Sequence, residues 1–269
     1  MLNALRIKQL TLFDFYHSLT SLKGLVFIIP YFLFWYLVFD ATGEHTVEVL
    51  QSAQGLMLSS WLLDDQELAL QMFVDRSASL SLYLLIAVSV SPFFIMLAAN
   101  NQYSSDANRG AFRFILTRTT RTELFLSRFL SVLLLILICT LITSIWALSR
   151  AYLQNEDTLL TLSLFTLETF IIIIFYSLPF IAFMSMVSAF AKSGFAALFL
   201  GMMLYVLLII ISLWLKPDIS YISYLIPSAM KATLFDVSYQ NIILSVLALS
   251  CYTLIYFLCG WYLFKRRDM

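Results

Sequence analysis

Arginine is concentrated in one short stretch of this chain. Residues 104–128, SSDANRGAFRFILTRTTRTELFLSR, contain five of the 16 Lys and Arg residues, and all five are arginines. Guanidinium groups bind carboxylate and phosphate oxygens, so such a cluster could bind an acidic protein surface or anionic lipid headgroups. It could also only mark the cytoplasmic side of a membrane protein, where Lys and Arg accumulate. The charge of the stretch leaves these three interpretations open.

The order of residues in the first half of the stretch predicts a short amphipathic helix. Ser105 followed by Asp106 is typical of a helix start, where a side-chain cap precedes a carboxylate. An apolar ridge follows at helical spacing, and two arginines four residues apart flank it. Such a helix could bind in a groove of a cytoplasmic protein. Its candidate docking residues are Asp106, Arg109, Gly110, Phe112, Arg113, Ile115 and Leu116.

The second half of the stretch predicts the start of another helix. Residues 117–120 interrupt the first helix, and Thr120 and Glu123 then have the T-x-x-E spacing of a capping box. Arg121 and Arg128 lie on the approach to the apolar run that follows. We therefore expect Thr120, Arg121 and Glu123 to fix the start of a helix that enters the membrane.

Residues that could perform catalysis are scarce. His17 and His45 are the only histidines, and the motifs G-x-x-x-x-G-K-[ST], H-E-x-x-H and G-x-S-x-G do not occur. We therefore expect no catalytic residue, no bound metal and no cofactor. Because the first of these motifs is the one that cradles ATP phosphates, any ATPase activity is expected in a separate subunit.

Three residues inside or at the edge of apolar runs are candidates for an intramembrane role. Glu168 is an acid at the edge of such a run, and a carboxylate within the membrane is a functional candidate by default. Its place near the end of the run would also let it reach water. Pro92 lies inside another run and Pro179 lies inside the same run as Glu168; both could kink a helix and serve as hinges, or be purely structural.

The composition identifies the elements that must carry these residues. Hydrophobic residues make up 61% of the chain and charged residues 12%, and the mean hydropathy is +0.90. A span of the bilayer needs about 20 mostly apolar residues in a helix. The sequence therefore predicts an all-α membrane protein that forms a single domain over residues 1–269. The six expected spans are residues 24–39, 79–99, 129–149, 167–190, 194–215 and 242–264.

The distribution of Lys and Arg predicts the orientation of these spans. With the N-terminus inside, the inner segments hold twelve of these residues and the outer segments four, so both termini are expected in the cytoplasm. Residues 104–128 then form a cytoplasmic loop, and residues 40–77 and 216–241 are outer loops with short helices. Residues 3–22 read as an amphipathic helix on the inner membrane surface, in contact with lipid. The zero net charge gives no indication of a nucleic-acid partner.

The run D-x-x-R-G that begins at Asp106, followed by I-L-T-R and R-x-E-L-x-x-x-R, resembles the signature of type-2 ATP-binding-cassette (ABC-2) permeases. The layout of six spans with an amphipathic N-terminal helix is similar as well. The resemblance implies that residues 105–116 are a coupling helix that contacts a cytoplasmic ATPase. It also implies a second copy of the chain, an exporter, and the inner membrane of a bacterium. Thr119 and Thr120 stand where the family usually has Pro, and Ala111 replaces a small hydroxyl residue.

The layout permits an alternative function. The long outer loop at residues 40–77 is similar to that of the permease that helps mature the copper sites of nitrous oxide reductase. The chain could thus be a scaffold or mechanical transmitter that acts on a periplasmic protein through this loop without moving a bulk substrate. The sequence names no substrate in either case. A membrane-embedded enzyme is a third class, which the scarcity of clustered His, Cys and acidic residues disfavours.

Overall fold

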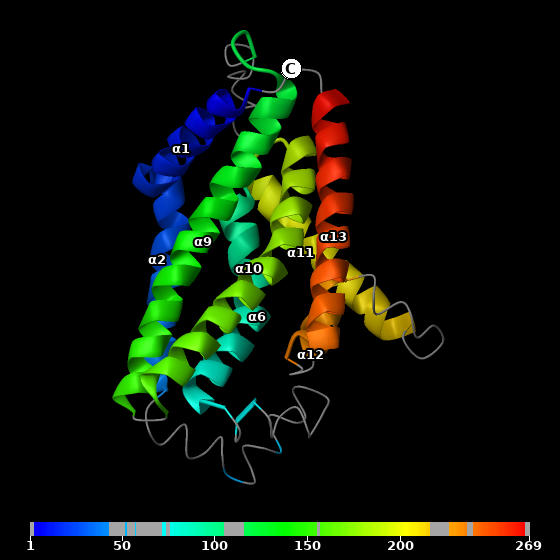
Figure 1. Cartoon of the computed structure of the whole chain (residues 1–269). Coiled ribbons are helices and arrows are strands. Elements are labelled where there is room, and N and C mark those ends of the chain that lie inside the picture. Colours follow the sequence, from blue (N-terminus) through cyan, green and yellow to red (C-terminus); the bar gives the residue numbers. More distant parts are fainter. Residues whose placement is uncertain are drawn as a thin grey trace.

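The computed structural model describes residues 3–42, 52, 57, 72–73, 76–104, 116–154, 157–215, 226–235 and 239–266. All regular structure in these residues is helical (Figure 1), which confirms the all-α fold class. The elements are α1 (Ala4–Thr20), α2 (Leu22–Ala41), α6 (Ala78–Ala99), α9 (Arg121–Leu153), α10 (Leu159–Phe190), α11 (Gly194–Leu215), the 3-10 helix η2 (Pro227–Met230), α12 (Lys231–Phe235) and α13 (Tyr239–Arg266).

Six helices in this described part of the chain are long and apolar enough to cross a membrane. They are α2, α6, α9, α10, α11 and α13, and together they indicate an integral membrane protein. The number of expected spans is therefore confirmed. Such helices dominate because lipid offers no partner for backbone N–H and C=O groups, which a helix satisfies internally.

Two of the helices extend well beyond the apolar runs that predicted them. α9 has 33 residues and α10 has 32, whereas about 20 suffice to cross the hydrocarbon core. Each begins at a threonine cap, Thr120 or Thr158, whose side chain accepts a backbone N–H three residues later. The segments between these caps and the apolar runs contain no Pro or Gly, so the helices continue without a break.

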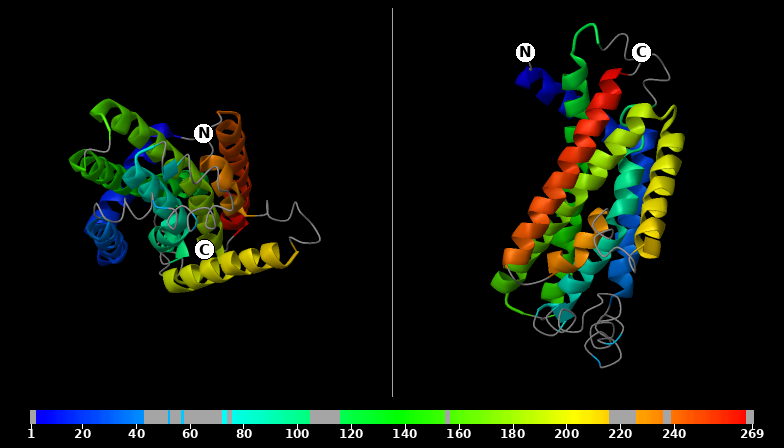
Figure 2. Two further views of the ribbon diagram at one scale, coloured as in Figure 1. Left: turned by 90° about the horizontal axis from the view of Figure 1, so that it is seen from below. Right: turned by 90° about the vertical axis from the view of Figure 1, so that its right-hand side faces the viewer.

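The helices differ in how deeply the bundle buries them. α6, α9 and α10 form its centre, and α2, α11 and α13 lie around them with most of their apolar side chains exposed (Figures 1 and 2). α13 packs closely against α10 at Gly260, where a Cβ atom would lie 3.0 Å from the Met186 backbone. In a bilayer, the exposed apolar faces are available to lipid and to other subunits.

Helix α1 lies beside the N-terminal half of α9, at the end of the bundle that also carries the C-terminus of α13 (Figure 1). Thr11 faces α9 and is buried, whereas Leu5, Phe13 and Tyr16 on the opposite side are each about 70% exposed. An apolar face turned outward is what a helix on a membrane surface presents to lipid. Ser21 separates α1 from α2 and caps the latter through the Gly24 N–H at 3.2 Å.

The segment before α13 returns into the bundle. Ile226, Met230, Leu234 and Phe235 are all at most 4% exposed, so η2 and α12 pack among the long helices. The Ser245 hydroxyl of α13 lies 2.7 Å from a hydroxyl of α12 and joins the two helices. Most of residues 40–77, including the short helices expected there, lie outside the described residues.

Candidate functional site

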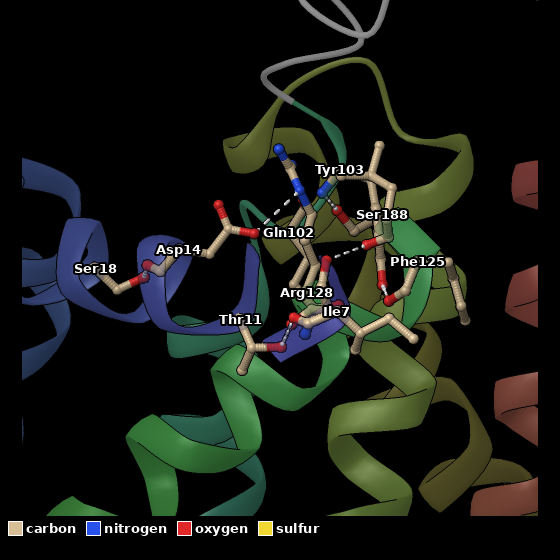
Figure 3. A network of polar contacts seen from close by, with 11 residues as sticks. Ile7, Thr11, Asp14, Ser18, Gln102, Tyr103, Phe125, Arg128 and Ser188 are labelled. Carbon is tan, nitrogen blue, oxygen red and sulfur yellow. Dashed lines mark hydrogen bonds and ion pairs between the residues drawn. The ribbon is translucent and has the colours of Figure 1, made fainter. Parts of the chain in front are cut away.

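The two flanks of residues 105–115 meet at one end of the bundle. The first flank is residues 100–104, which follow α6, and the second is residues 116–128, which lead into α9. Figure 3 shows polar side chains from α1, α9, α10 and the first flank converging there. We call these two flanks, together with the side chains that hold them, the loop anchor.

Helix α10 holds the first flank through two serines. Ser188 Oγ accepts the N–H groups of Tyr103 at 3.1 Å and Ser104 at 3.3 Å (Figure 3). Ser185 Oγ donates to the side-chain oxygen of Gln102 at 2.6 Å. Backbone groups released where α6 ends are thus satisfied by side chains of another helix. The hydrogen bonds from α10 therefore fix the path of the chain after the end of α6.

Tyr103 ties the first flank to α9. Its ring is fully buried and stacks on Phe125 with 5.0 Å between centroids, and its hydroxyl donates to the Phe125 carbonyl oxygen at 2.8 Å. Burial raises the pKa of Tyr103 well above its usual value, so the hydroxyl stays a donor. Phe264 of α13 and Leu124 complete this small cluster, and Leu116 packs against it.

Glu123 joins the second flank to the start of α1. Its Oε2 accepts the Thr120 N–H at 2.9 Å, while Thr120 Oγ1 accepts the Glu123 N–H at 3.2 Å, so the capping box predicted from the T-x-x-E spacing is present. Its other oxygen, Oε1, accepts the N–H of Asn3, the cap residue of α1, at 2.9 Å. A single carboxylate, 1% exposed, therefore fixes the beginnings of two helices.

Arg128 connects α9 to both α1 and the first flank. Its Nε lies 3.8 Å from Oδ2 of Asp14 in α1, and its Nη1 donates to the carbonyl oxygen of Gln102 (Figure 3). The Thr11 hydroxyl of α1 lies one turn away and bonds the Ser127 carbonyl oxygen at 3.3 Å. Arg128 is 8% exposed, and a cation this buried needs such partners.

The end of α13 closes the other side of the loop anchor. Arg121 Nη1 donates to the Lys265 carbonyl oxygen at 2.5 Å, and Trp261 Nε1 donates to the Thr122 hydroxyl at 3.3 Å. A cation at the C-terminal end of a helix also interacts favourably with the helix dipole. The second flank is therefore bound to α13 as well as to α1.

A protein-family profile described as "Protein of unknown function (DUF2705)" matches residues 67–269, which are 203 of the 269 residues. The chain belongs to the DUF2705 family. A comparison with curated proteins found no match. The DUF2705 range contains α6 through α13 and both flanks of the loop anchor, whereas α1 and α2 precede it.

Most of the predicted docking residues of this DUF2705 protein lie outside the described residues. They are Asp106, Arg109, Gly110, Phe112, Arg113 and Ile115. Leu116 is described and is half-buried against the cluster around Tyr103. Thr120 and Glu123 start α9 as predicted from their spacing, and Arg121 reaches across to α13. A docking role for the residues before Leu116 remains a prediction.

Glu168 lies far from the loop anchor, at the opposite end of the bundle. Its Oε1 is 3.4 Å from Nη1 of Arg76, and both side chains are partly exposed. The Arg76 guanidinium also lies 4.8 Å from the centroid of the Phe165 ring. Glu168 is therefore part of a surface ion pair that joins α10 to the segment before α6. A pair of this kind contributes about 0–1 kcal/mol to stability.

Pro92 and Pro179 lie inside α6 and α10, and both helices continue past them. Nearby serines, Ser91 and Ser177, each donate to the carbonyl four residues earlier, at 2.5 and 2.6 Å. These bonds satisfy the serine hydroxyls within their own helices. A hinge role for either proline remains a prediction.

Local sequence patterns do not indicate which distant residues hold the loop anchor. The contact between Asp14 and Arg128 joins residues 114 positions apart. Arg128 could have been singled out from the sequence as a residue that needs buried partners, because it is a lone cation inside the apolar run LFLSRFLSV. In the part of the chain that the structure describes, no three His, Cys, Asp or Glu side chains gather as a metal site requires.

Proposed function

We propose that this DUF2705 protein is the membrane subunit of an ABC-2-type exporter in the inner membrane of a bacterium. The loop anchor carries the proposal, because it fixes both flanks of residues 105–115 to four helices, α1, α9, α10 and α13. A cytoplasmic partner that moved this segment would thereby move the membrane helices. The sequence between the flanks supplies the arginines and apolar ridge that resemble a coupling helix.

The partner would be a separate ATPase subunit on the cytoplasmic side. Phe112, Ile115 and Leu116 would fill a groove on this subunit, and Arg109 and Arg113 would pair with acidic residues at its rim. Closure of the ATPase would displace the segment, and the bonds of Glu123, Arg128 and Tyr103 would transmit the displacement to α1, α9 and α10. The resemblance to ABC-2 permeases alone supplies the outward direction of transport, and no residue described above names a substrate.

A second copy of the chain would complete the transporter. The exposed apolar residues of α2, α11 and α13 include Val26, Leu33, Phe199, Leu247 and Leu254, each more than half exposed. Such faces can pack against lipid or against the same face of another subunit. The accumulation of Lys and Arg in the segments assigned to the cytoplasm supports an orientation with both termini and the proposed docking segment on that side.

Charge reversal in the docking segment tests the proposal. The full chain, tagged and produced in its own host, would be isolated in a mild detergent, and copurifying proteins with a nucleotide-binding P-loop would be identified by mass spectrometry. We expect such an ATPase with the unmodified chain and its loss with Arg109→Glu combined with Arg113→Glu. The matched control is Arg118→Glu, a reversal of an exposed arginine just beyond the ridge. Equal recovery of the ATPase in all three samples would show that the docking role is wrong.

A further inference from the structure

A cavity of about 540 Å³ lies between the middle of α6, the middle of α11 and the returning segment η2–α12. Its volume falls within the range of about 300–1,000 Å³ that is usual for small-molecule sites. The lining is mostly apolar and includes Phe93, Met96, Met202, Val206, Ile209 and Ile226. None of its lining residues belongs to the loop anchor, so the cavity is a separate site.

The cavity opens to the outside of the bundle between α6 and α11. Phe93 of α6 and Val206 of α11 both line it and are both 51% exposed. The two helices contact each other on one side of the molecule (Figure 2). Because both belong to the six apolar helices that could cross a membrane, the opening would face the acyl chains of the bilayer.

Lys231 gives this apolar cavity a positive charge. It is the first residue of α12, it lines the cavity, and it is half-buried. No described residue forms a hydrogen bond or an ion pair with its ammonium group. Burial lowers the pKa of Lys231 because desolvation disfavours the charged form. A cation buried in such apolar surroundings is costly, and an anionic ligand would relieve that cost.

Hydroxyl groups lie around the same cavity. Tyr205 of α11 and Ser228 of η2 line the cavity, and Ser89 and Ser212 contribute to the walls of α6 and α11. The cavity thus combines one cation and several hydroxyls with a long apolar wall. A carboxylate with an attached acyl chain matches this combination, because each of its two parts meets the surface that suits it.

We propose that this cavity binds a single-chain anionic amphiphile of the fatty-acid class that enters from the membrane. The carboxylate would bind at Lys231 and the chain would lie along Phe93, Val206 and Ile209. The volume suits one acyl chain better than a two-chain phospholipid. The inference needs only the cavity and its lysine, so it holds whether or not the chain couples to an ATPase.

Photolabelling of the purified full-length protein in lipid nanodiscs tests the proposal. The probe is a long-chain fatty acid with a photoreactive group on its chain, and the matched neutral probe is the alcohol of the same chain. We expect saturable labelling of α6 and α11 by the acid, and much weaker labelling by the alcohol. Lys231→Gln should weaken acid labelling about tenfold or more, since a hydrogen bond to a charged group contributes about 1.5–3 kcal/mol.

Two charge variants serve as controls. Lys231→Arg keeps the positive charge and should retain labelling, and Lys192→Gln removes an exposed lysine and should have no effect. If Lys231→Gln does not fold, Ile209→Trp fills the cavity while keeping the lysine, and it should abolish labelling. Unchanged labelling in the Lys231→Gln or Ile209→Trp variant overturns the proposal. Equal labelling by acid and alcohol, or no labelling because a second copy covers the opening, overturns it too.

Discussion

Replacement of Glu123 by Ala should detach α1 from α9. The Glu123 carboxylate accepts the Thr120 N–H and the Asn3 N–H, both at 2.9 Å, from a position that is 1% exposed. Removal of the side chain leaves only water to accept these two bonds. The variant therefore leaves two backbone donors without their acceptor, one at the beginning of each helix.

The size of the effect follows from the two bonds. A hydrogen bond to a charged group contributes about 1.5–3 kcal/mol, and loss of a helix cap alone costs about 1 kcal/mol. Glu123→Ala should therefore lower the free energy of unfolding by about 2–4 kcal/mol. Thr120→Ala removes only the threonine half of the capping box and leaves the Asn3 bond, so it should cost about 1 kcal/mol.

Disulfide trapping between α1 and α9 measures the detachment directly. The three native cysteines, Cys139, Cys251 and Cys259, are free and would first be replaced by serine. A cysteine pair is placed at Thr11 and Ser127, because the Thr11 hydroxyl bonds the Ser127 carbonyl oxygen and the two residues are therefore neighbours. We expect slower cross-linking and a lower melting temperature in Glu123→Ala than in Thr120→Ala.

Glu168→Gln provides a matched removal of one carboxylate at the other end of the bundle. Its ion pair with Arg76 is partly exposed, so the change should cost at most about 1 kcal/mol and leave the cross-linking rate unchanged. The reasoning is refuted if Glu123→Ala melts and cross-links like Thr120→Ala, because the bond to Asn3 would then contribute nothing.

Three further predictions concern other positions. Arg128→Met should destabilise the protein by about 1–3 kcal/mol and make α1 more accessible to protease, because the bond to the first flank and the ion pair to α1 are both lost. Gly260→Val should lower the melting temperature, because its Cβ would press on the Met186 backbone from 3.0 Å, whereas Gly201→Ala should be tolerated because it meets only a flexible methionine side chain. Lys231→Met should raise the melting temperature of lipid-free protein at pH 7. Burial lowers the pKa of Lys231, so the charged lysine destabilises the folded protein fully at pH values below this lowered pKa. The stability gained by Lys231→Met should therefore disappear as the pH rises to 10.5, the usual pKa of lysine.

Features set by neighbouring residues could be predicted from the sequence. The T-x-x-E spacing of Thr120 and Glu123 gave the start of α9, because a capping box needs only two residues three positions apart. The six apolar runs gave the six long helices for a similar reason, since each helix satisfies its own backbone. The helix starts were less accurate, because the apolar runs were bounded at charged residues, Arg128 in α9 and Glu168 in α10, whereas both helices continue through them.

Contacts between distant residues could not be predicted in the same way. The helical pattern of α1 separated an apolar face from a polar face but did not show that Asp14 would meet Arg128. The pattern also could not show that Asn3 would bind a carboxylate 120 residues later. Each of these pairs depends on how α1 crosses α9, and no local periodicity specifies that crossing. The place of Lys231 beside a cavity likewise follows from the return of α12 into the bundle.

The length of α9 has a mechanical consequence. Thirty-three residues form a helix about 50 Å long, and Arg121–Leu153 is one unbroken element. Near its far end, Arg150 Nη2 donates to the Phe39 carbonyl oxygen of α2 at 2.9 Å. A change in tilt of about 10° would displace one end of a rod of this length by about 9 Å relative to the other. A small tilt of α9 at Glu123 would therefore become a large displacement near Arg150, beside the last turn of α2.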